Sequence, residues 1–220
     1  MFDLLLPQRC LLCAAPGTQV CAACAEGLPR IVAPFCERCG TPTAWPVLRC
    51  AECSGRRLAF ARARAAVEYG VGARRIVVAW KERGLRKLAG WAAAVVEATV
   101  PRPDAAALVW VPPDHDRLLW RGHNAAELLA RELADAWELP AAGALARARG
   151  SPRQRGSSRV ERRRNVARAF SLTGEVPARV ALVDDVYTTG ATAHFAASAL
   201  RRGGAKHVEI VTFARTIRIR

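Results

Sequence analysis

The sequence lacks long apolar runs, and its first residues do not resemble an export signal. No stretch of roughly 18 consecutive apolar residues occurs, which excludes a typical membrane-spanning helix. An acid, Asp3, stands where a secretory signal carries basic residues, and the apolar run that follows it is too short for such a signal. We therefore expect a cytoplasmic protein with no membrane insertion.

Lysine is scarce, although the protein is strongly basic. Lys81, Lys87 and Lys206 are the only lysines among 34 basic residues, so 31 are arginines, against 19 acids. The formal net charge is +15 and the pI is about 10.8. This excess of base indicates a polyanionic partner, which could be nucleic acid, an anionic membrane surface or a phosphorylated substrate.

The remaining composition is that of a folded protein. Hydrophobic residues make up 51% of the 220 residues, which is enough to build a core and excludes overall disorder. The length suits one α/β domain with a small additional module.

Cysteine is absent after residue 53, and all eight cysteines fall into four C-x-x-C pairs. The two thiolates of such a pair converge, and two pairs supply the four sulfurs of a tetrahedral zinc site. We therefore predict two zinc sites with a structural or docking role, because a site closed by four thiolates has no open position for chemistry. The predicted ligands are Cys10, Cys13, Cys21, Cys24, Cys36, Cys39, Cys50 and Cys53.

The sequence leaves the pairing of these cysteines open. The pairs could combine in sequential order, as two stacked ribbons, or interleave as a cross-braced module. Sequential pairing closes shorter loops at a lower entropic cost, which favours it. Disulfides are the competing interpretation, and the expected cytoplasmic location disfavours them. We place the double zinc-knuckle module at residues 1–56 and a second domain at residues 57–220.

Residues 57–220 alternate between strand-like and helix-like patterns. Short apolar, β-branched runs indicate buried strands, and apolar residues at helical spacing, such as Ile76, Val77 and Trp80, indicate helices. This alternation predicts a parallel sheet with helical crossovers. The expected strands are 63–69, 107–111, 180–183 and 207–214, the expected helices are 85–100, 125–137 and 192–202, a loop is expected at 114–117, and a basic tail at 215–220.

The stretch 180–192, V-A-L-V-D-D-V-Y-T-T-G-A-T, joins a strand to a helix. Its small residues place backbone N–H groups and hydroxyls at a helix N-terminus, where the helix dipole favours an anion. Asp184 and Asp185 would repel a phosphate unless they face sugar hydroxyls or a cation, so the stretch suits a phosphate beside a ribose diol. An ordinary strand–loop–helix crossover is the alternative. The predicted phosphate cradle consists of Thr188, Thr189, Gly190, Ala191 and Thr192.

Residues 147–168 hold nine arginines and a single acid, Glu161, which leaves a local formal charge of +8. A charge run of this kind is often only a solvated face. The alternative is a basic loop that closes over phosphates or grips a nucleic-acid backbone. The arginines predicted to contact nucleic acid are Arg155, Arg159, Arg162, Arg163 and Arg164. Trp120, which stands among basic residues, is a candidate for stacking on a base.

These motifs carry a family resemblance. Residues 180–192 resemble the phosphoribosyl-diphosphate (PRPP) signature of type I phosphoribosyltransferases at every position. Over nearly its whole length, the chain resembles the ComF family of cytoplasmic competence-associated proteins, in which a cysteine module precedes a phosphoribosyltransferase-like domain. The resemblance rests on the four C-x-x-C pairs, Tyr69-Gly70 followed by Lys81, V-P-P-D-H at 111–115, R-G-H-N at 121–124, Gln154, E-R-R-R-N at 161–165 and Phe170. Departures from the family pattern are Glu82, His123, Ala126 and the acid within V-P-P-D-H.

The resemblance implies an α/β fold with a phosphoribosyltransferase-like parallel sheet flanked by helices. It implies that Asp184 and Asp185 hold the ribose diol and, in a catalytic domain, act on the charge that develops at C1′. The threonine-glycine cradle would bind the 5′-phosphate, and a loop containing residues 155–165 would close over the site. Other residues expected to contact PRPP or its Mg²⁺ are Lys81, Pro112, His115 and Arg121.

The resemblance also implies a function. We expect a competence or DNA-uptake accessory protein that binds PRPP or a related ribose phosphate and single-stranded DNA, with an ATP-driven DNA translocase as a further partner. The main alternative is an active phosphoribosyltransferase that transfers ribose 5-phosphate from PRPP to an unknown acceptor. A scaffold whose pocket is a relic or a nucleotide sensor is the third. Whether the chain is an enzyme stays open on the sequence.

Overall fold

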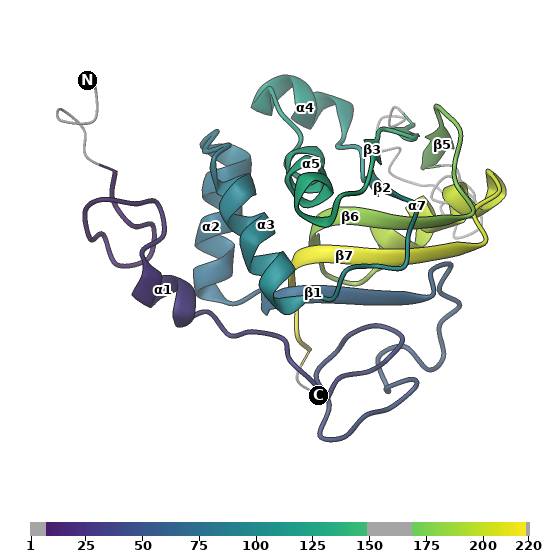
Figure 1. Ribbon diagram of the computed structural model, residues 1–220, viewed down its shortest axis with the longest axis horizontal. Helices are drawn as coiled ribbons and strands as arrows, with labels where there is room; N and C mark the ends of the chain where they lie inside the picture. Colours follow the sequence, from purple (N-terminus) through teal and green to yellow (C-terminus); the bar gives the residue numbers. More distant parts are fainter. Residues whose placement is uncertain (1–7, 149–168, 219–220) are drawn as a thin grey trace, which may run out of the picture.

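The computed structural model describes residues 8–148 and 169–218 (Figure 1). Its strands are β1 (Arg62–Glu68), β2 (Ala107–Trp110), β3 (Ala141–Ala142), β4 (Leu145–Arg147), β5 (Phe170–Leu172), β6 (Arg179–Tyr187) and β7 (His207–Arg215). Its helices are α1 (Ala22–Glu26), α2 (Val71–Glu82), α3 (Leu88–Thr99), α4 (His115–Arg121), α5 (Ala125–Trp137) and α7 (Ala191–Arg202). Within these described ranges, no helix is long and apolar enough to cross a membrane.

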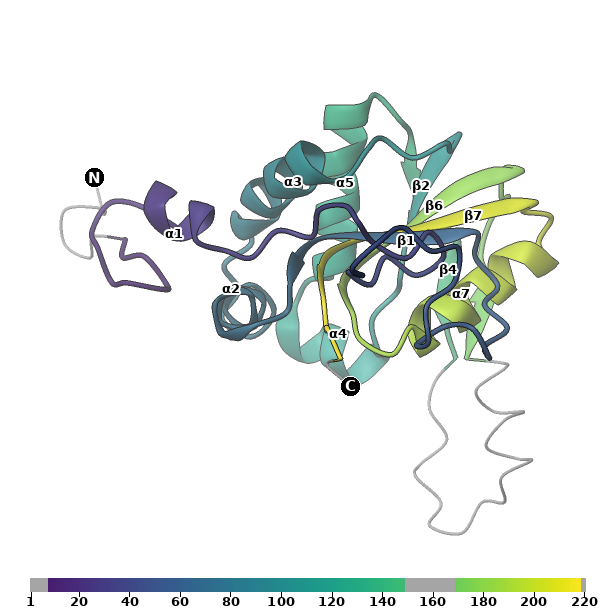
Figure 2. The same cartoon turned by 90° about the horizontal axis from the view of Figure 1, so that it is seen from below.

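Five strands form one parallel sheet in the order β1-β7-β6-β2-β3, and β4 pairs with β5 in a separate antiparallel hairpin. Helices α3 and α5 cover one face of the sheet, with α2 beside α3, while α7 covers the opposite face (Figure 2). The predicted α/β fold, a parallel sheet flanked by helices with a cysteine module before it, is confirmed.

Strand β6 lies at the centre of this sheet and carries the most important sequence motif. Its first apolar residues, 180–183, are fully buried because helices cover both faces of the sheet. The strand does not stop at Val183, as the sequence predicted, but pairs with β7 as far as Tyr187. Asp184 and Asp185 are therefore strand residues, held in a fixed register at the carboxyl end of the central strand.

The segment after β2 differs from the expected loop. Residues 114–117 begin helix α4 instead, and the Asp114 carboxylate accepts a hydrogen bond of 3.3 Å from the backbone N–H of Asp116. An aspartate at this N-cap position satisfies one of the N–H groups that a helix leaves unpaired at its start. Because α4 is only seven residues long, its apolar residues show too little periodicity for the sequence to predict it.

The expected basic tail also begins later than predicted. Arg215 is the last residue of β7 and is only 1% exposed, so it belongs to the core rather than to a solvated tail. The reason is a long-range contact that the sequence does not reveal. The Arg215 guanidinium donates hydrogen bonds to the carbonyl oxygen of Cys39 and to the carboxylate of Glu52.

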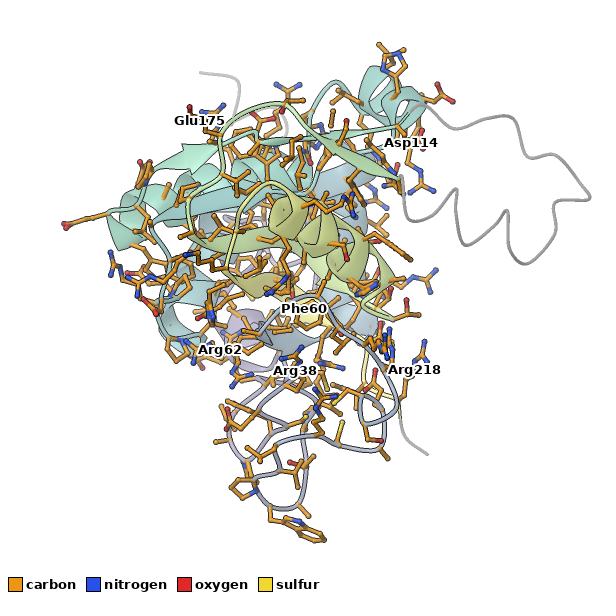
Figure 3. The ribbon with its side chains drawn as sticks, turned by 90° about the vertical axis from the view of Figure 1, so that its right-hand side faces the viewer. Arg38, Phe60, Arg62, Asp114, Glu175 and Arg218 are labelled. Carbon is orange, nitrogen blue, oxygen red and sulfur yellow. The ribbon has the colours of Figure 1, made fainter. Side chains whose placement is uncertain are left out.

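The cysteine-rich module is divided into two ribbons that contact different parts of the main domain. The first ribbon, which includes α1, lies beside α2, where Arg75 donates to the carbonyl oxygen of Leu12. The second ribbon packs against the edge strand β1. There, a Cβ atom on Gly40 would lie 2.4 Å from the carbonyl oxygen of Ala63, so only glycine permits this approach. Figure 3 shows this junction, with Arg38, Phe60 and Arg62 between the sheet and the ribbon.

Candidate functional site

A cavity of about 630 Å³ opens where β2 and β6 end, between α2, α4 and the loop that joins β6 to α7. Ligands of open parallel sheets bind at this edge, outside the carboxyl ends of the strands. The cavity brings together residues that are more than one hundred positions apart in the sequence. Seven of the residues predicted to bind PRPP line it: Lys81, Pro112, Arg121, Asp184, Asp185, Thr188 and Thr192.

The two aspartates stand in different electrostatic environments. Asp185 is buried and pairs with Lys81, whose Nζ lies 2.5 Å from Asp185 Oδ2. Asp184 borders the cavity, yet desolvation and then the charge of Asp185 raise the pKa of the Asp184 carboxyl well above its usual range. A carboxyl held in this way favours a partner that compensates its charge, such as a cation or the hydroxyl groups of a sugar.

The loop after β6 forms the start of α7. Gly190 is its N-cap, with a φ of 72°, and no side chain caps the helix at this position. The first N–H groups of a helix lack intrahelical partners, so they are available to an anion. Ala191 N–H donates to the Thr189 hydroxyl at 3.3 Å, which orders the loop. This geometry fits a phosphate group.

Not every predicted cradle residue borders the main cavity. Thr188 and Thr192 do, whereas Thr189 and Ala191 are exposed beside it. Gly190 lines a much smaller space of about 20 Å³ that adjoins the cavity and shares Asp184 with it. The predicted cradle is therefore assembled as one loop, but only part of it faces the larger space.

His115 is the predicted contact that the structure places elsewhere. It is exposed at the first position of α4 and is not among the residues that line the cavity. Arg117 and Arg121, four positions apart on one side of α4, border the cavity instead. Arg121 was predicted as a contact and lines the cavity, whereas Arg117 was not predicted and lines it in place of His115. Trp120 also lies on the outside of α4, where it is 71% exposed.

Arg121 does not stand alone. It forms an ion pair with Glu82, one of the residues that depart from the family pattern. This pair joins the end of α2 to the end of α4, and both of its residues line the cavity. Arg147, at the end of β4, also borders the cavity and lies over the ring of Phe170, 5.4 Å from its centroid.

His123 and Asn124 link the elements that surround the cavity, and the sequence did not predict these roles. His123 is buried, and its two ring nitrogens each lie 2.9 Å from a carbonyl oxygen, of Arg121 and of Trp80. Asn124 caps α5 by accepting from the N–H of Ala126 and donates to the carbonyl oxygen of Val111. An asparagine before a helix is an N-cap signal, so its structural role was open to prediction. The contacts of His123 were not, because they join separate elements.

The eight cysteines form two clusters in sequential order. Cys10, Cys13, Cys21 and Cys24 make the first, Cys36, Cys39, Cys50 and Cys53 the second, and within each cluster the sulfur atoms lie within 4.8 Å of one another. Sequential pairing is therefore confirmed over interleaved pairing.

The sulfur positions fit zinc. A tetrahedron with Zn–S bonds of about 2.3 Å has sulfur atoms about 3.8 Å apart. The Cys13–Cys21 and Cys36–Cys53 sulfur pairs are 3.6 Å apart, and the Cys39–Cys50 pair is 3.5 Å apart. A disulfide needs about 2.05 Å, so these separations do not correspond to disulfides.

The thiol pKa values within the clusters diverge. Burial opposes ionisation of Cys10, but backbone N–H groups, Cys21 first, lower the pKa of its thiol to about 6. By the same balance the pKa of Cys36 falls to about 7. Neighbouring sulfurs, Cys13 first, raise the pKa of Cys24 to about 12. Four thiolates therefore need a bound cation to share one site, which is what zinc supplies.

We predict that the purified protein contains two zinc ions per chain. Replacing one ligand in either cluster, as in Cys24→Ser or Cys53→Ser, should reduce the content to one, because three thiolates hold zinc less tightly than four. Elemental analysis alongside protein quantification measures this ratio. A content near zero in protein purified without chelators, with no free thiols, would show instead that the cysteines are oxidised.

The arginines predicted to contact nucleic acid, Arg155, Arg159, Arg162, Arg163 and Arg164, lie outside the described residues.

Known proteins resemble this chain along almost its whole length. The double zinc ribbon domain family matches residues 1–54. Competence protein F of Haemophilus influenzae is 28% identical over 94% of this chain and 96% of its own length. The DNA utilization protein YhgH of Salmonella typhi is 30% identical over 97% of this chain and 100% of its own. Competence protein ComFC of Bacillus subtilis is 28% identical over 94% of this chain and 89% of its own.

The matches run through both the cysteine ribbons and the sheet domain, so the two parts occur together in these relatives as they do here. The resemblance drawn from the sequence motifs is thereby confirmed, and this chain belongs to the ComF family of competence and DNA utilization proteins.

Proposed function

We propose that this protein acts in competence or DNA utilization, that its main domain binds PRPP or a related ribose phosphate with Mg²⁺, and that the chain binds single-stranded DNA. The names of the relatives support the first part. One structural observation supports the second: paired aspartates, Thr192 from the first turn of α7 and several cationic side chains line a single cavity.

Each part of PRPP has a chemical counterpart in this cavity. The α7 N-terminus and the hydroxyls of Thr188 and Thr192 suit the 5′-phosphate. Asp184 and Asp185 suit the ribose diol, and Arg117 and Arg121 suit the diphosphate. Bound Mg²⁺ would neutralise diphosphate charge, with oxygen ligands from the substrate and from carboxylates at the cavity wall.

The acid in the V-P-P-D-H loop does not oppose this proposal. Asp114 borders the cavity, but its carboxylate already accepts the N–H of Asp116 and caps α4. Part of its charge is therefore compensated by the helix N-terminus. Arg117, from the first turns of the same helix, borders the same cavity.

Transfer of the ribosyl group to an acceptor is the second candidate function. The sugar would pass through an oxocarbenium-like state, and the carboxylates of Asp184 and Asp185 would stabilise the positive charge that develops at C1′. Tyr69 and Val77 line the same cavity and form an apolar wall against which an acceptor could rest. Release of pyrophosphate in a screen of candidate acceptors tests this reaction.

Titration calorimetry with PRPP and Mg²⁺ tests the ligand proposal. We expect saturable binding to the zinc-loaded protein and at least about tenfold weaker binding to the Asp184→Asn, Asp185→Asn double variant, a difference of about 1.4 kcal/mol. Asp104→Asn is the matched control, because Asp104 is exposed and pairs with Arg179, away from the cavity. Equal affinity in all three proteins would refute the assignment of the aspartates.

The positive charge of the chain supports its proposed binding to single-stranded DNA. The chain carries a formal net charge of +15, and the nine arginines between residues 147 and 168 concentrate it. A protein that neutralises phosphates releases counterions, so binding to single strands should weaken with salt at a log–log slope of about −0.7 per phosphate contact. We also propose an ATP-driven DNA translocase as a partner of this chain in the transfer of single-stranded DNA.

We predict that Arg162→Gln, Arg163→Gln and Arg164→Gln together weaken single-strand binding equally for all sequences and reduce the salt slope. The control triple, Arg201→Gln, Arg202→Gln and Lys206→Gln, removes the same charge from an exposed region around the end of α7. Fluorescence anisotropy with labelled oligonucleotides at several salt concentrations measures both quantities. If the two triple variants bind alike, the segment is not the DNA contact.

A further inference from the structure

One buried arginine connects the second cysteine cluster with the predicted phosphate cradle, residues 188–192, which we call the phosphate loop. Arg215 ends β7, the neighbour of β6, and is only 1% exposed. Its Nη1 donates to the carbonyl oxygen of Cys39, and its Nη2 donates to Glu52 Oε2 at 3.1 Å. Cys39 is a member of the second cluster. A positively charged side chain of the main domain therefore contacts the backbone of one of the predicted zinc ligands.

The acceptor side of this contact belongs entirely to the second ribbon. The Thr41 hydroxyl donates to the same Glu52 oxygen at 2.8 Å, and the Thr41 oxygen lies 3.1 Å from Cys39 Sγ. The cluster, Thr41 and Glu52 thus form one hydrogen-bonded group that receives the guanidinium. Its geometry depends on the fold of the ribbon, which four sulfurs around a metal would fix.

The same guanidinium also contacts Tyr187, the last residue of β6. Its Cζ lies 4.8 Å from the centroid of the Tyr187 ring, within the range of a cation–π contact. Tyr187 is buried against the edge of the Phe60 ring, at a centroid separation of 6.3 Å. Burial raises the pKa of the Tyr187 phenol to about 12, so the ring stays neutral beside the arginine.

Tyr187 in turn supports the backbone of the phosphate loop. A Cβ atom on Gly190 would lie 2.2 Å from the Tyr187 hydroxyl oxygen, so the backbone of Gly190 rests directly on the phenol. Gly190 is the N-cap of α7 and has a φ of 72°. The position of the phenol therefore limits where the first N–H groups of α7 can lie.

We propose that Arg215 is a positioning residue through which the second zinc cluster sets the conformation of the phosphate loop. The path runs from the Cys39 carbonyl through the guanidinium of Arg215 and the ring of Tyr187 to the backbone of Gly190. This inference deepens the proposed function and rests on it for the identity of the ligand. It makes the second ribbon part of the ligand site, although no cysteine touches the cavity.

The buried charge makes this path sensitive to the state of the cluster. Among the residues that the structure describes, neither Arg215 Nε nor Glu52 Oε1 has a hydrogen-bond partner. The guanidinium therefore depends on the Cys39 carbonyl and one carboxylate oxygen for its compensation. Loss of the metal would release Cys39, and a buried arginine that loses an acceptor must rearrange. Tyr187 would then lose the group that packs on its ring.

Arg64 supplies a matched control within the same interface. It also reaches from the sheet to the second ribbon, where its Nη2 lies 2.8 Å from Glu37 Oε2, and its guanidinium lies over the Phe35 ring, 4.4 Å from the centroid. It belongs to β1, and its partners in the ribbon are Glu37 and Phe35 rather than Cys39 and Glu52. Removing Arg64 disturbs the ribbon–sheet contact without touching the path to Gly190.

The first test measures ligand affinity in the zinc-loaded chain, at a temperature well below unfolding. Arg215→Met should weaken the binding of PRPP with Mg²⁺ by about tenfold, the size of a typical coupling between sites, while both zinc ions remain bound. Arg64→Met should bind within about twofold of the unaltered protein. A merely structural role for Arg215 would lower the melting temperature and leave the affinity of the folded protein unchanged.

The second test needs no ligand and uses the fact that the chain has only two tyrosines, Tyr69 and Tyr187. Incorporation of 3-fluorotyrosine gives one fluorine resonance for each, and Tyr69→Phe assigns them. Cys50→Ser, which removes a sulfur from the second cluster, should shift or broaden the Tyr187 resonance. Cys13→Ser, which removes a sulfur from the first cluster instead, should leave it in place. This arm also decides the matter if Arg215→Met fails to fold.

The two tests separate the inference from the proposed function. If the unaltered protein does not bind PRPP, the ligand proposal fails, and the fluorine spectra still decide whether the second cluster controls Tyr187. Equal affinity in Arg215→Met and Arg64→Met, or a Tyr187 resonance that is unaffected by Cys50→Ser, would overturn the inference. A response of Tyr187 to Cys50→Ser but not to Cys13→Ser supports it.

Discussion

The candidate site depends on two adjacent carboxylates at the carboxyl end of β6, the central strand of the sheet. Asp184 and Asp185 follow four fully buried residues of β6, and Asp185 is itself buried, whereas Asp184 is partly exposed to the cavity. The ion pair of Lys81 with Asp185 compensates one of them from α2. Asp184 is left with a raised pKa beside the cavity. A cation or the hydroxyl groups of a sugar would compensate the charge of these carboxylates. A sugar phosphate that binds together with a metal ion therefore suits this cavity.

The two cysteine ribbons contact the main domain at separate places. The first ribbon contacts α2, the helix that carries Lys81, and the second contacts β1 and the end of β7. The first ribbon therefore packs against a helix that lines the cavity, and the second packs against the two strands β1 and β7 beside β6. A small module with few buried apolar residues gains most of its folding energy from metal binding. Zinc would thus stabilise both contacts between the ribbons and the main domain.

Local patterns allowed much of this structure to be predicted from sequence. The apolar run of β6, the small-residue turn into α7 and the spacing of the C-x-x-C pairs are each complete within a few residues, so they predicted a buried strand, the start of a helix and two cysteine clusters. Helix α4 was missed because it is too short to show periodicity, and with it the exposure of His115. The burial of Arg215 depends on partners 176 and 163 positions away in the sequence, Cys39 and Glu52, which no local pattern contains.

We propose that the loop after β6 and the paired aspartates hold a ribose 5-phosphate group. Phosphorus NMR of PRPP with Mg²⁺ tests it directly, because the 5′-phosphate and the diphosphate give separate resonances. Inorganic pyrophosphate in excess suppresses general anion binding to this basic protein. Our account predicts that the zinc-loaded protein still shifts or broadens the 5′-phosphate resonance under this competition. A 5′-phosphate resonance that stays unchanged at stoichiometric protein would contradict it.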